Sequence, residues 1–151
     1  MAQSDLQWPT DSAEAFLALG RKVLAQQPFS GLIGAELAAL APGRCELRLA
    51  LTEQLKQQHG FAHGGAVSYL ADNALTYAGG TAMRVPVVTS EYKINYVRPA
   101  VGEVLVARAE AVAIGRNQTV CRCEVVALAG GEEKLVALAQ GTIARLPEKE
   151  S

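Results

Sequence analysis

The residues best suited to chemistry lie in one segment, QQHGFAHGG at 57–65, and in the acid that follows it, Asp72. Two glycines, Gly64 and Gly65, open a helical pattern although glycine is unfavourable for helix stability. Tight packing or an unusual dihedral angle is the structural explanation, and for the glycines alone it is the better one. The functional explanation is that glycine lets a ligand reach the unpaired N–H groups at the positive end of a helix. Those donors suit an oxyanion or a polarised carbonyl.

Asp72 favours the functional explanation. It lies inside an otherwise apolar helix, where an unpaired carboxylate is costly to bury. Gly64, Ser68, Asp72 and Thr76 follow at four-residue intervals and form a polar stripe of small residues. A solvated helix face is the ordinary explanation of such a stripe. Here the other faces are so apolar that we expect the stripe to be buried or to face a cleft.

The spacing of Gly64 and Asp72 bears on assembly. Eight residues span about 12 Å along a helix, whereas a nucleophile or base must come within about 3 Å of its target. Asp72 therefore cannot serve an oxyanion at the start of its own helix, but it can serve an antiparallel second copy. The spacing predicts a homodimer with two equivalent sites related by a two-fold axis.

Hydrophobic periodicity indicates the elements that position these residues. Asp11 and Glu14 have capping-box spacing and begin a helix that Pro28 stops. The long central helix begins near His63 and is predicted to end at Gly79-Gly80. Strands are predicted over 32–41, 44–51, 88–97, 103–114, 117–128 and 134–146.

The order of these elements is helix, two strands, one buried helix and four strands. Runs of strands without β–α alternation indicate an α+β class with an antiparallel sheet. One apolar helix against one long sheet predicts five or six strands curled around that helix. We expect one domain over 11–146, a flexible N-terminus over 1–10 and a C-terminal tail over 147–151.

Composition excludes several classes of protein. Half of the 151 residues are apolar, which fits a globular chain, and the formal net charge of −1 argues against nucleic acid as a partner. No run approaches the roughly 20 apolar residues of a membrane span. No Lys or Arg precedes Arg21, so a signal peptide is not expected. We expect a cytoplasmic protein that does not contact membranes.

The three cysteines fit a reducing compartment, because an odd number does not suit a disulfide framework. Cys121 and Cys123 lie two apart in a strand pattern and are predicted to be core residues. His59 and His63 have H-x-x-x-H spacing, but they precede the helix and lack a third ligand. We therefore expect no metal site.

The motif HGGAVSYLAD at 63–72, with TSEYKINYVRPAVGE following at 89–103, resembles the hotdog-fold acyl-CoA thioesterases. The branch with the phenylacetate-pathway and 4-hydroxybenzoyl-CoA thioesterases is the most similar, and the resemblance covers roughly residues 30 to 146. The combination of HGG, an acid nine residues after the His, Y-x-R-P and the Gly115-Arg116 turn is fairly specific. It implies a sheet wrapped around the central helix, and hydrolysis of an acyl-CoA to free acid and CoA. It also implies no separate cofactor, and dimers that often pair into tetramers.

The resemblance implies a role for each matching position. The N–H of Gly64 would polarise the thioester carbonyl, and Asp72 would be the nucleophile or general base. Gln57 would be a second polarising group or would hold water, and His63 would shape the site and contact the thioester.

Other positions complete this prediction. The hydroxyl group that orients water matches either Thr76 or Thr89. Gly65 and Ser68 are predicted to line the substrate site. The candidates for binding the CoA phosphates are Arg98, Arg116 and Arg84, and a solvated surface charge is an equally good explanation of each.

Other functions were weighed against thioester hydrolysis. Ser68, His63 and Asp72 suggest a Ser-His-Asp hydrolase, but the G-x-S-x-G elbow is missing. A hotdog dehydratase or hydratase usually pairs His with an acid in a different sequence context. A non-catalytic acyl-CoA-binding protein would need an output domain and would lack the acid. The sequence therefore favours a thioesterase, with an aryl, arylacetyl or medium-chain acyl group left open.

Overall fold

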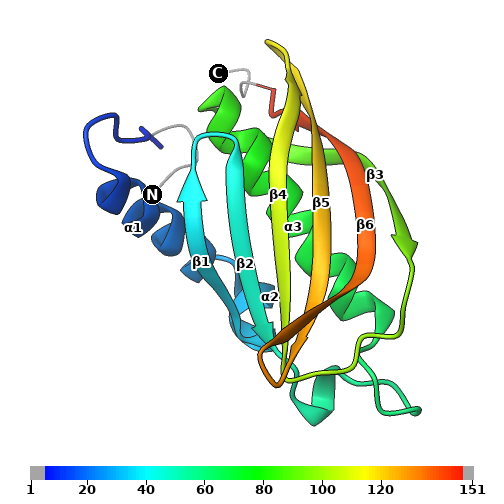
Figure 1. Ribbon diagram of the computed structural model, residues 1–151. Coiled ribbons are helices and arrows are strands. Elements are labelled where there is room, and N and C mark those ends of the chain that lie inside the picture. Colours follow the sequence, from blue (N-terminus) through cyan, green and yellow to red (C-terminus); the bar gives the residue numbers. More distant parts are fainter. Residues whose placement is uncertain (1–5, 148–151) are drawn as a thin grey trace.

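The computed structural model of the protein describes residues 6–147. Figure 1 shows one curved sheet that wraps around a long helix, α3. The sheet has six antiparallel strands in the order β1-β2-β4-β5-β6-β3. The predicted α+β class, with a central helix and an added N-terminal helix, is confirmed. The ends of the predicted N-terminal and C-terminal segments, residues 1–5 and 148–151, lie outside the described residues.

The helices are α1 (Ala13–Ala25), α2 (Pro28–Ile33) and α3 (Gly64–Met83), with a short 3-10 turn, η2, at Glu53–Leu55. The strands are β1 (Ala35–Ala41), β2 (Arg44–Ala50), β3 (Val87–Tyr96), β4 (Val104–Ile114), β5 (Gln118–Ala129) and β6 (Glu132–Arg145). The last four lie within two residues of their predicted bounds.

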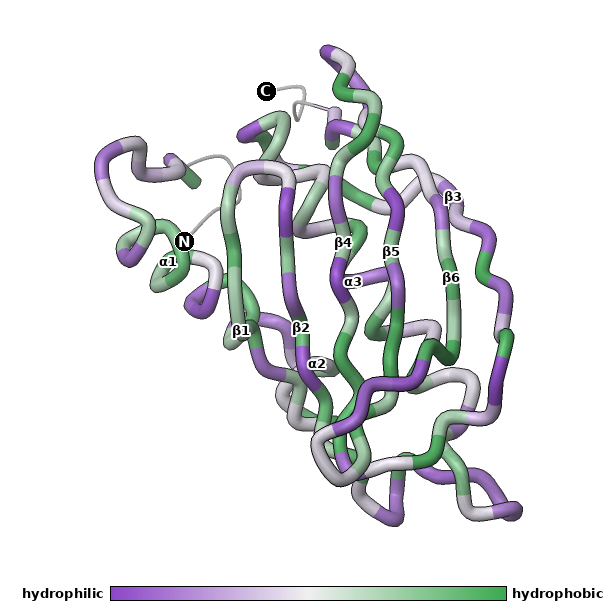
Figure 2. The backbone as a smooth tube through the Cα atoms, in the orientation of Figure 1, coloured by the Kyte–Doolittle hydropathy of each residue, from purple (hydrophilic) through white to green (hydrophobic). Residues whose placement is uncertain are grey.

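The helix α3 forms the centre of the core. Its inward-facing residues are completely buried, and they are mostly small: Leu70, Ala71, Ala74, Leu75 and Ala78. Small side chains allow the strands to approach the helix axis closely, so the sheet can curve around it. Figure 2 shows the matching pattern in the sheet, where hydrophobic and hydrophilic residues alternate along the strands.

The prediction that Gly79-Gly80 ends the helix is wrong. The helix continues to Met83, and Arg84 ends it in the left-handed conformation, with φ 56°. The two glycines serve packing instead. A Cβ at Gly79 would lie 2.6 Å from the Cβ of Ile143 on β6, which is closer than two carbon atoms can pack.

Two details at the N-terminal end also differ from prediction. Ser12, not Asp11, caps α1, since its hydroxyl accepts the Ala15 N–H at 3.1 Å. The strand predicted over 32–41 begins only at Ala35. The residues before it form α2, because Pro28 favours the first turn of a helix and Gly34, at φ 81°, ends it.

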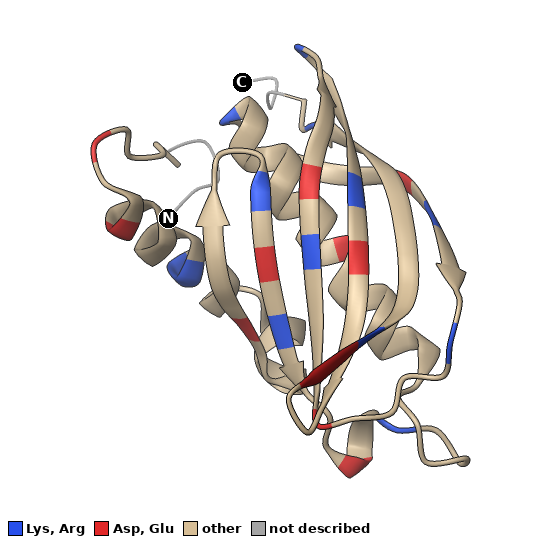
Figure 3. Cartoon of the chain, in the orientation of Figure 1, with Lys and Arg blue, Asp and Glu red and all other residues tan. Residues whose placement is uncertain are grey.

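Charged residues lie at neighbouring positions on β2, β4 and β5 (Figure 3), and most of them are exposed, on the face of the sheet away from α3. Arg108 on β4 donates hydrogen bonds to Glu46 on β2 at 2.9 Å and to Glu133 on β6 at 2.6 Å. The hydrogen bond from Arg108 lowers the pKa of Glu133. These contacts join three strands on the solvent side, and exposed pairs of this kind contribute little to stability, about 0–1 kcal/mol each.

The packing of Gly79 against Ile143 gives a prediction about stability. Gly79→Ala should lower the free energy of unfolding by about 1–3 kcal/mol, because the added methyl group must displace Ile143 or the helix. Urea denaturation at a fixed protein concentration measures this. Gly31→Ala in α2 is the matched control: no atom lies within 4 Å of its added Cβ, so stability should stay equal or rise by up to about 1 kcal/mol. Equal losses in both variants would contradict the packing argument.

Candidate active site

The start of α3 presents an unpaired backbone donor. His63 caps the helix, and its Nδ1 accepts the Gly65 N–H at 2.8 Å. The Ala66 N–H donates to the carbonyl of His63 at 2.9 Å. The Gly64 N–H has no acceptor within residues 6–147. It is therefore free to polarise a ligand carbonyl at the positive end of a long helix.

A cavity of about 370 Å³ opens beside this donor, lined by Gln57, Gly64, Tyr96 and Arg98 among others. The Gln57 Oε1 accepts the N–H of His59 in its own loop, which leaves the side-chain amide N–H groups to donate elsewhere. The Tyr96 hydroxyl donates to the Gly64 carbonyl at 3.1 Å. Arg98 is exposed and donates to the carbonyl of Leu135 at 3.0 Å. The structure thus brings together three predicted site residues: Gln57, Gly64 and Arg98.

Asp72 lies in a second cluster, two turns along α3. Its Oδ1 accepts the hydroxyl of Thr89 at 2.6 Å. The Thr76 hydroxyl lies 2.9 Å from both the backbone carbonyl of Asp72 and the Thr89 hydroxyl. Within the described chain no Lys or Arg forms an ion pair with Asp72. Thr89 therefore contacts the carboxylate directly, whereas Thr76 acts on it only through the backbone and Thr89.

The remaining stripe residue, Ser68, forms a hydrogen bond with the Tyr92 hydroxyl. The strand β3 thus supplies hydroxyl groups along the whole stripe, from Thr89, Tyr92 and Tyr96. The pairing of β3 with β6 shifts between Thr89 and Glu91, so Ser90 is the extra residue of a β-bulge. The bulge puts Thr89 and Tyr92 on the same face although they are three residues apart, a spacing that faces opposite sides in a regular strand.

Tyr92 and Tyr96 were not predicted as site residues. Alternation within β3 was visible in the sequence and does place both tyrosines on one face. The bulge that adds Thr89 to that face leaves no comparable pattern, so the alignment of the three hydroxyl groups with the stripe could not be read from spacing.

Two predicted arginines lie far from the start of α3. The β4–β5 turn that contains Arg116 extends beyond the end of the sheet nearest the last turn of α3 (Figure 1). Arg84 ends α3 and lies over the ring of Phe16, 6.0 Å from its centroid. Within one chain, neither is near the free Gly64 N–H.

The hydrogen bonds do not form a Ser-His-Asp triad. Ser68 is bonded to Tyr92, His63 is bonded to the Gly65 N–H, and neither is bonded to Asp72. The buried cysteines are also unsuited to nucleophilic attack. Desolvation raises the pKa of Cys121 and of Cys123 to about 12, so both thiols stay protonated at neutral pH.

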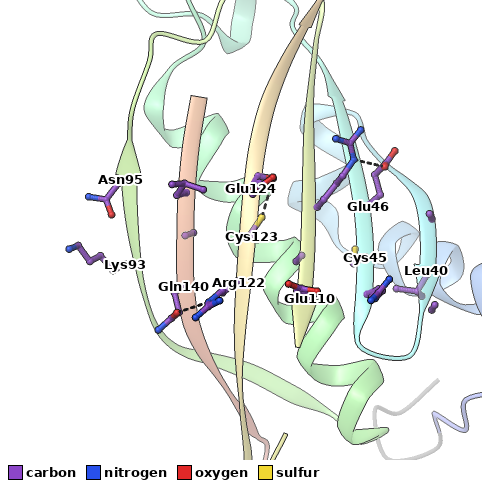
Figure 4. Close-up of a pocket in the computed structure, with 17 residues that line it drawn as sticks. Leu40, Cys45, Glu46, Lys93, Asn95, Glu110, Arg122, Cys123, Glu124 and Gln140 are labelled. Carbon is purple, nitrogen blue, oxygen red and sulfur yellow. Dashed lines mark hydrogen bonds and ion pairs between the residues drawn. The ribbon is translucent and has the colours of Figure 1, made fainter. Parts of the chain in front are cut away.

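A larger concavity, of about 910 Å³, lies on the outer face of the sheet (Figure 4). Its labelled side chains include Glu46, Glu110, Arg122 and Glu124 from β2, β4 and β5. None of the predicted site residues lines it, and α3 does not reach it. The volume alone therefore does not identify the site, which we place on the helix side of the sheet.

Within residues 6–147 no helix is long and apolar enough to cross a membrane.

A curved antiparallel sheet around one long helix defines the hotdog fold, and solved structures of two thioesterase-related proteins share it. A thioesterase family protein from Silicibacter pomeroyi is 40% identical and superposes with a TM-score of 0.79, covering 82% of this chain and 93% of that one. The PaaI protein of Escherichia coli, from the phenylacetic acid degradation operon, is 25% identical with a TM-score of 0.77, covering 85% and 91%. The same protein is also named acyl-coenzyme A thioesterase PaaI.

Sequence comparison agrees with the fold. A family model described as the thioesterase superfamily matches residues 59–134, which include His63, Gly64, Asp72 and Thr89. A putative esterase of Deinococcus radiodurans is 33% identical over 124 residues, covering 82% of both chains. The chain belongs to the thioesterase superfamily, and the reaction it catalyses is thioester hydrolysis.

The contact between Thr89 and Asp72 leads to a prediction about activity. Thr89→Val should lower kcat for thioester hydrolysis about 10- to 100-fold, because a hydrogen bond to a charged group is worth about 1.5–3 kcal/mol. Thr89→Ser keeps the hydroxyl and should retain most of the activity. Thr142→Val is the control, since it removes a hydroxyl that donates to an exposed carboxylate, that of Glu91. Steady-state release of free thiol measures all three, and equal kcat in the Val variants would exclude a role for Thr89.

Proposed function

We propose that this chain hydrolyses acyl-CoA thioesters to a free acid and CoA, in a site built from two copies of the chain. The observation that carries the proposal is the Asp72 carboxylate. It is partly buried, it is held by one hydroxyl group, and it is not neutralised by a cation of the described chain. A structural carboxylate in an apolar helix would be expected to have such a partner. The name of the E. coli relative, acyl-coenzyme A thioesterase, supports CoA as the thiol part of the substrate.

The Gly64 N–H is proposed to bind the thioester oxygen. As negative charge develops on that oxygen, the donor and the dipole of a 20-residue helix stabilise it more than they stabilise the ground state. The side-chain amide of Gln57, in the same cavity, supplies a second donor or holds the water. The backbone need not move to bind the thioester oxygen, because the Gly64 N–H is already free of an acceptor within residues 6–147.

Asp72 is proposed to act on the carbonyl carbon from the other side. As a general base it takes a proton from water while the water oxygen bonds to that carbon. The C–S bond then breaks, and the leaving thiolate takes the proton. As a nucleophile its oxygen instead bonds to that carbon, and the C–S bond breaks to release the thiolate and leave an anhydride. Water then opens the anhydride, which restores the Asp72 carboxylate, and the proton of that water goes to the thiolate. Both routes give the same acid and thiol, and Thr89 orients either the carboxylate or the water.

Assembly into a homodimer follows from the separation of the two groups. The strand β3 is an edge of the sheet, and no other strand of residues 6–147 pairs with its outer side. A second copy paired along β3 by a two-fold axis continues the sheet and lays the two α3 helices antiparallel. Asp72 of one copy then faces the start of α3 in the other. Pairing of two such dimers, and a cytoplasmic location, stay predictions from the sequence.

The same arrangement suggests how CoA is bound. Arg98 lies in the cavity at the start of α3 and is placed to contact the phosphates from one copy. The β4–β5 turn with Arg116 lies near the last turn of α3, far from the start of that helix. Because the two α3 helices are antiparallel in the proposed dimer, the Arg116 of the second copy lies toward this site. His63 and Gly65 border the thioester, and Ser68 lies between the two catalytic clusters.

Asp72→Asn tests the chemical role. It keeps the shape and polarity of the side chain but removes the charge, so kcat should fall on the order of 10²-fold or more while KM changes little. Asp72→Glu should keep partial activity, and Gln57→Ala should have a milder effect than Asp72→Asn. Release of thiol from a panel of acyl-CoAs measures these rates, with Asp11→Asn, an exposed acid, as the control. A kcat near that of the wild type in Asp72→Asn would show that the acid is structural.

Mixing two inactive variants tests whether the site is shared. Gly64→Pro removes only the proposed donor, because proline suits the first helical position, whereas Gly64→Ala keeps it and its Cβ lies an ordinary 3.6 Å from Tyr96. Gly64→Pro should be about 10²-fold less active than Gly64→Ala. Gly64→Pro refolded with an equal amount of Asp72→Ala should recover about a quarter of wild-type activity. About half of the dimers are then mixed, and each mixed dimer has one intact site out of two. No recovery in dimers shown by mass to be mixed would place the whole site in one chain.

A further inference from the structure

The side chain of Tyr96 holds the first turn of α3 from outside the helix. Its hydroxyl donates to the Gly64 carbonyl at 3.1 Å. Its ring lies against the same residue, because a Cβ at Gly64 would be 3.6 Å from Cζ of the ring. Tyr96 is the last residue of β3, and its pairing with Ala137 on β6 fixes the strand at that point. One side chain therefore attaches the start of the helix to the end of a strand.

The first turn needs such an attachment because two successive glycines form it. Glycine leaves the backbone more conformational freedom than any other residue. Gly65 is nevertheless required, since a Cβ there would lie 2.9 Å from the Nδ1 of His63. That nitrogen caps the helix by accepting the Gly65 N–H at 2.8 Å. The glycine that makes room for the cap thus also leaves the cap poorly restrained by its own backbone.

Tyr96 and His63 bind opposite ends of the same peptide group. The Gly64 carbonyl and the Gly65 N–H belong to one planar unit. Tyr96 donates to the oxygen of this unit, and the Nδ1 of His63 accepts from its N–H. Two such hydrogen bonds fix the plane of the peptide group, and each polarises the group in favour of the other. The Tyr96 hydroxyl therefore acts on the His63 ring through a single peptide group.

The position of Tyr96 also fits the shared site. Along β3, Thr89 contacts Asp72 and Tyr96 contacts Gly64. In the proposed dimer Asp72 of one copy faces Gly64 of the other, so Thr89 of the first copy lies opposite Tyr96 of the second. Within one chain Tyr96 is 54% exposed, and it lines the cavity beside Gly64. Its exposed ring therefore belongs to the wall of the site.

Resting on the proposed function, we propose that Tyr96 is a positioning residue for hydrolysis. It holds the peptide group between Gly64 and Gly65, and through that group it keeps the His63 ring turned toward the thioester. A polar group that is already oriented stabilises charge in the transition state without first being reorganised. Tyr96 itself does not contact the reacting atoms.

Tyr96→Phe removes the hydroxyl and keeps the ring. We expect kcat for thiol release from acyl-CoA to fall about 3- to 10-fold, the scale of one neutral hydrogen bond. KM should change little, because the substrate still binds and only the alignment of His63 is lost. Tyr77→Phe is the matched control, since the buried Tyr77 hydroxyl also donates to a glycine carbonyl of a helix, that of Gly20 in α1, at 2.8 Å. Tyr77 lies outside the cavity at the start of α3, so its loss should lower stability and leave kcat unchanged.

The histidine rings give a reading that does not depend on activity. The chain has two histidines, and His59 is exposed, so nitrogen NMR of protein labelled at histidine contains its own reference. The Nδ1 signal of His63 should differ from that of His59, because it accepts the Gly65 N–H. In Tyr96→Phe it should move toward the His59 signal, and in Tyr77→Phe it should stay in place. A purely structural hydrogen bond would lower stability without moving this signal.

Gly65→Ala tests the route from Tyr96 to His63. Its added methyl group displaces the His63 ring from the cap, so loss of the Tyr96 hydroxyl should then have no further effect. Tyr96→Phe is expected to lower kcat in the wild type but not in Gly65→Ala, since two changes that act through one group are not additive. Equal fold losses in both backgrounds would overturn the inference, because Tyr96 would then act independently of the cap.

Failure of this inference and failure of the proposed function give different results. Wild-type kcat and an unmoved His63 signal in Tyr96→Phe, with hydrolysis still lost in Asp72→Asn, would overturn the role of Tyr96 and leave the proposed function standing. Hydrolysis that persists in Asp72→Asn would overturn the proposed function, and with it any role of Tyr96 in that reaction. A lower kcat together with a shifted His63 signal in Tyr96→Phe, and neither change in Tyr77→Phe, would support the inference.

Discussion

The close packing of α3 against the curved sheet governs most of this structure. The sheet can approach the helix closely only where side chains are small, as at Gly79, where a Cβ would lie 2.6 Å from the Cβ of Ile143. Polar groups on such a helix cannot reach water easily, so each requires a partner at hand. Asp72 accepts a hydrogen bond from the Thr89 hydroxyl, and Asn73 donates one to Gln27. The demands of packing therefore place the Thr89 hydroxyl beside the carboxylate that the proposed chemistry uses.

The strand β3 connects the fold to the site. It is the last strand of the sheet, so it is free to bind a second copy, and it is also the strand whose hydroxyl groups face the helix stripe. The bulge at Ser90 accounts for the second property, because it turns Thr89 toward α3 without disturbing the pairing with β6 on either side. A change in this strand would therefore be expected to affect assembly and chemistry together.

Much of this architecture was predictable from sequence because its signals are periodic. The alternation in β2 to β6 and the apolar stripe of α3 each repeat over many residues, so the class, the order and the central helix could be predicted. Single-residue signals failed where tertiary contacts decide. Gly79-Gly80 has the composition of a helix end, yet the approach of Ile143 requires it in mid-helix. Leu32 fits a strand, but Pro28 begins a helix there. The bulge at Ser90 leaves no periodic signal, so the placement of Thr89 on the same face as Tyr92 could not be read from spacing.

The cap at the start of α3 fixes the chemical form of one side chain. Because Nδ1 of His63 accepts the Gly65 N–H, the single hydrogen of the neutral imidazole belongs to Nε2. The ring is then oriented as a donor through Nε2, because Nδ1 is already bonded to the Gly65 N–H. In the reaction that we propose, an imidazole held in this tautomer would present an N–H group to the sulfur of the leaving thiolate.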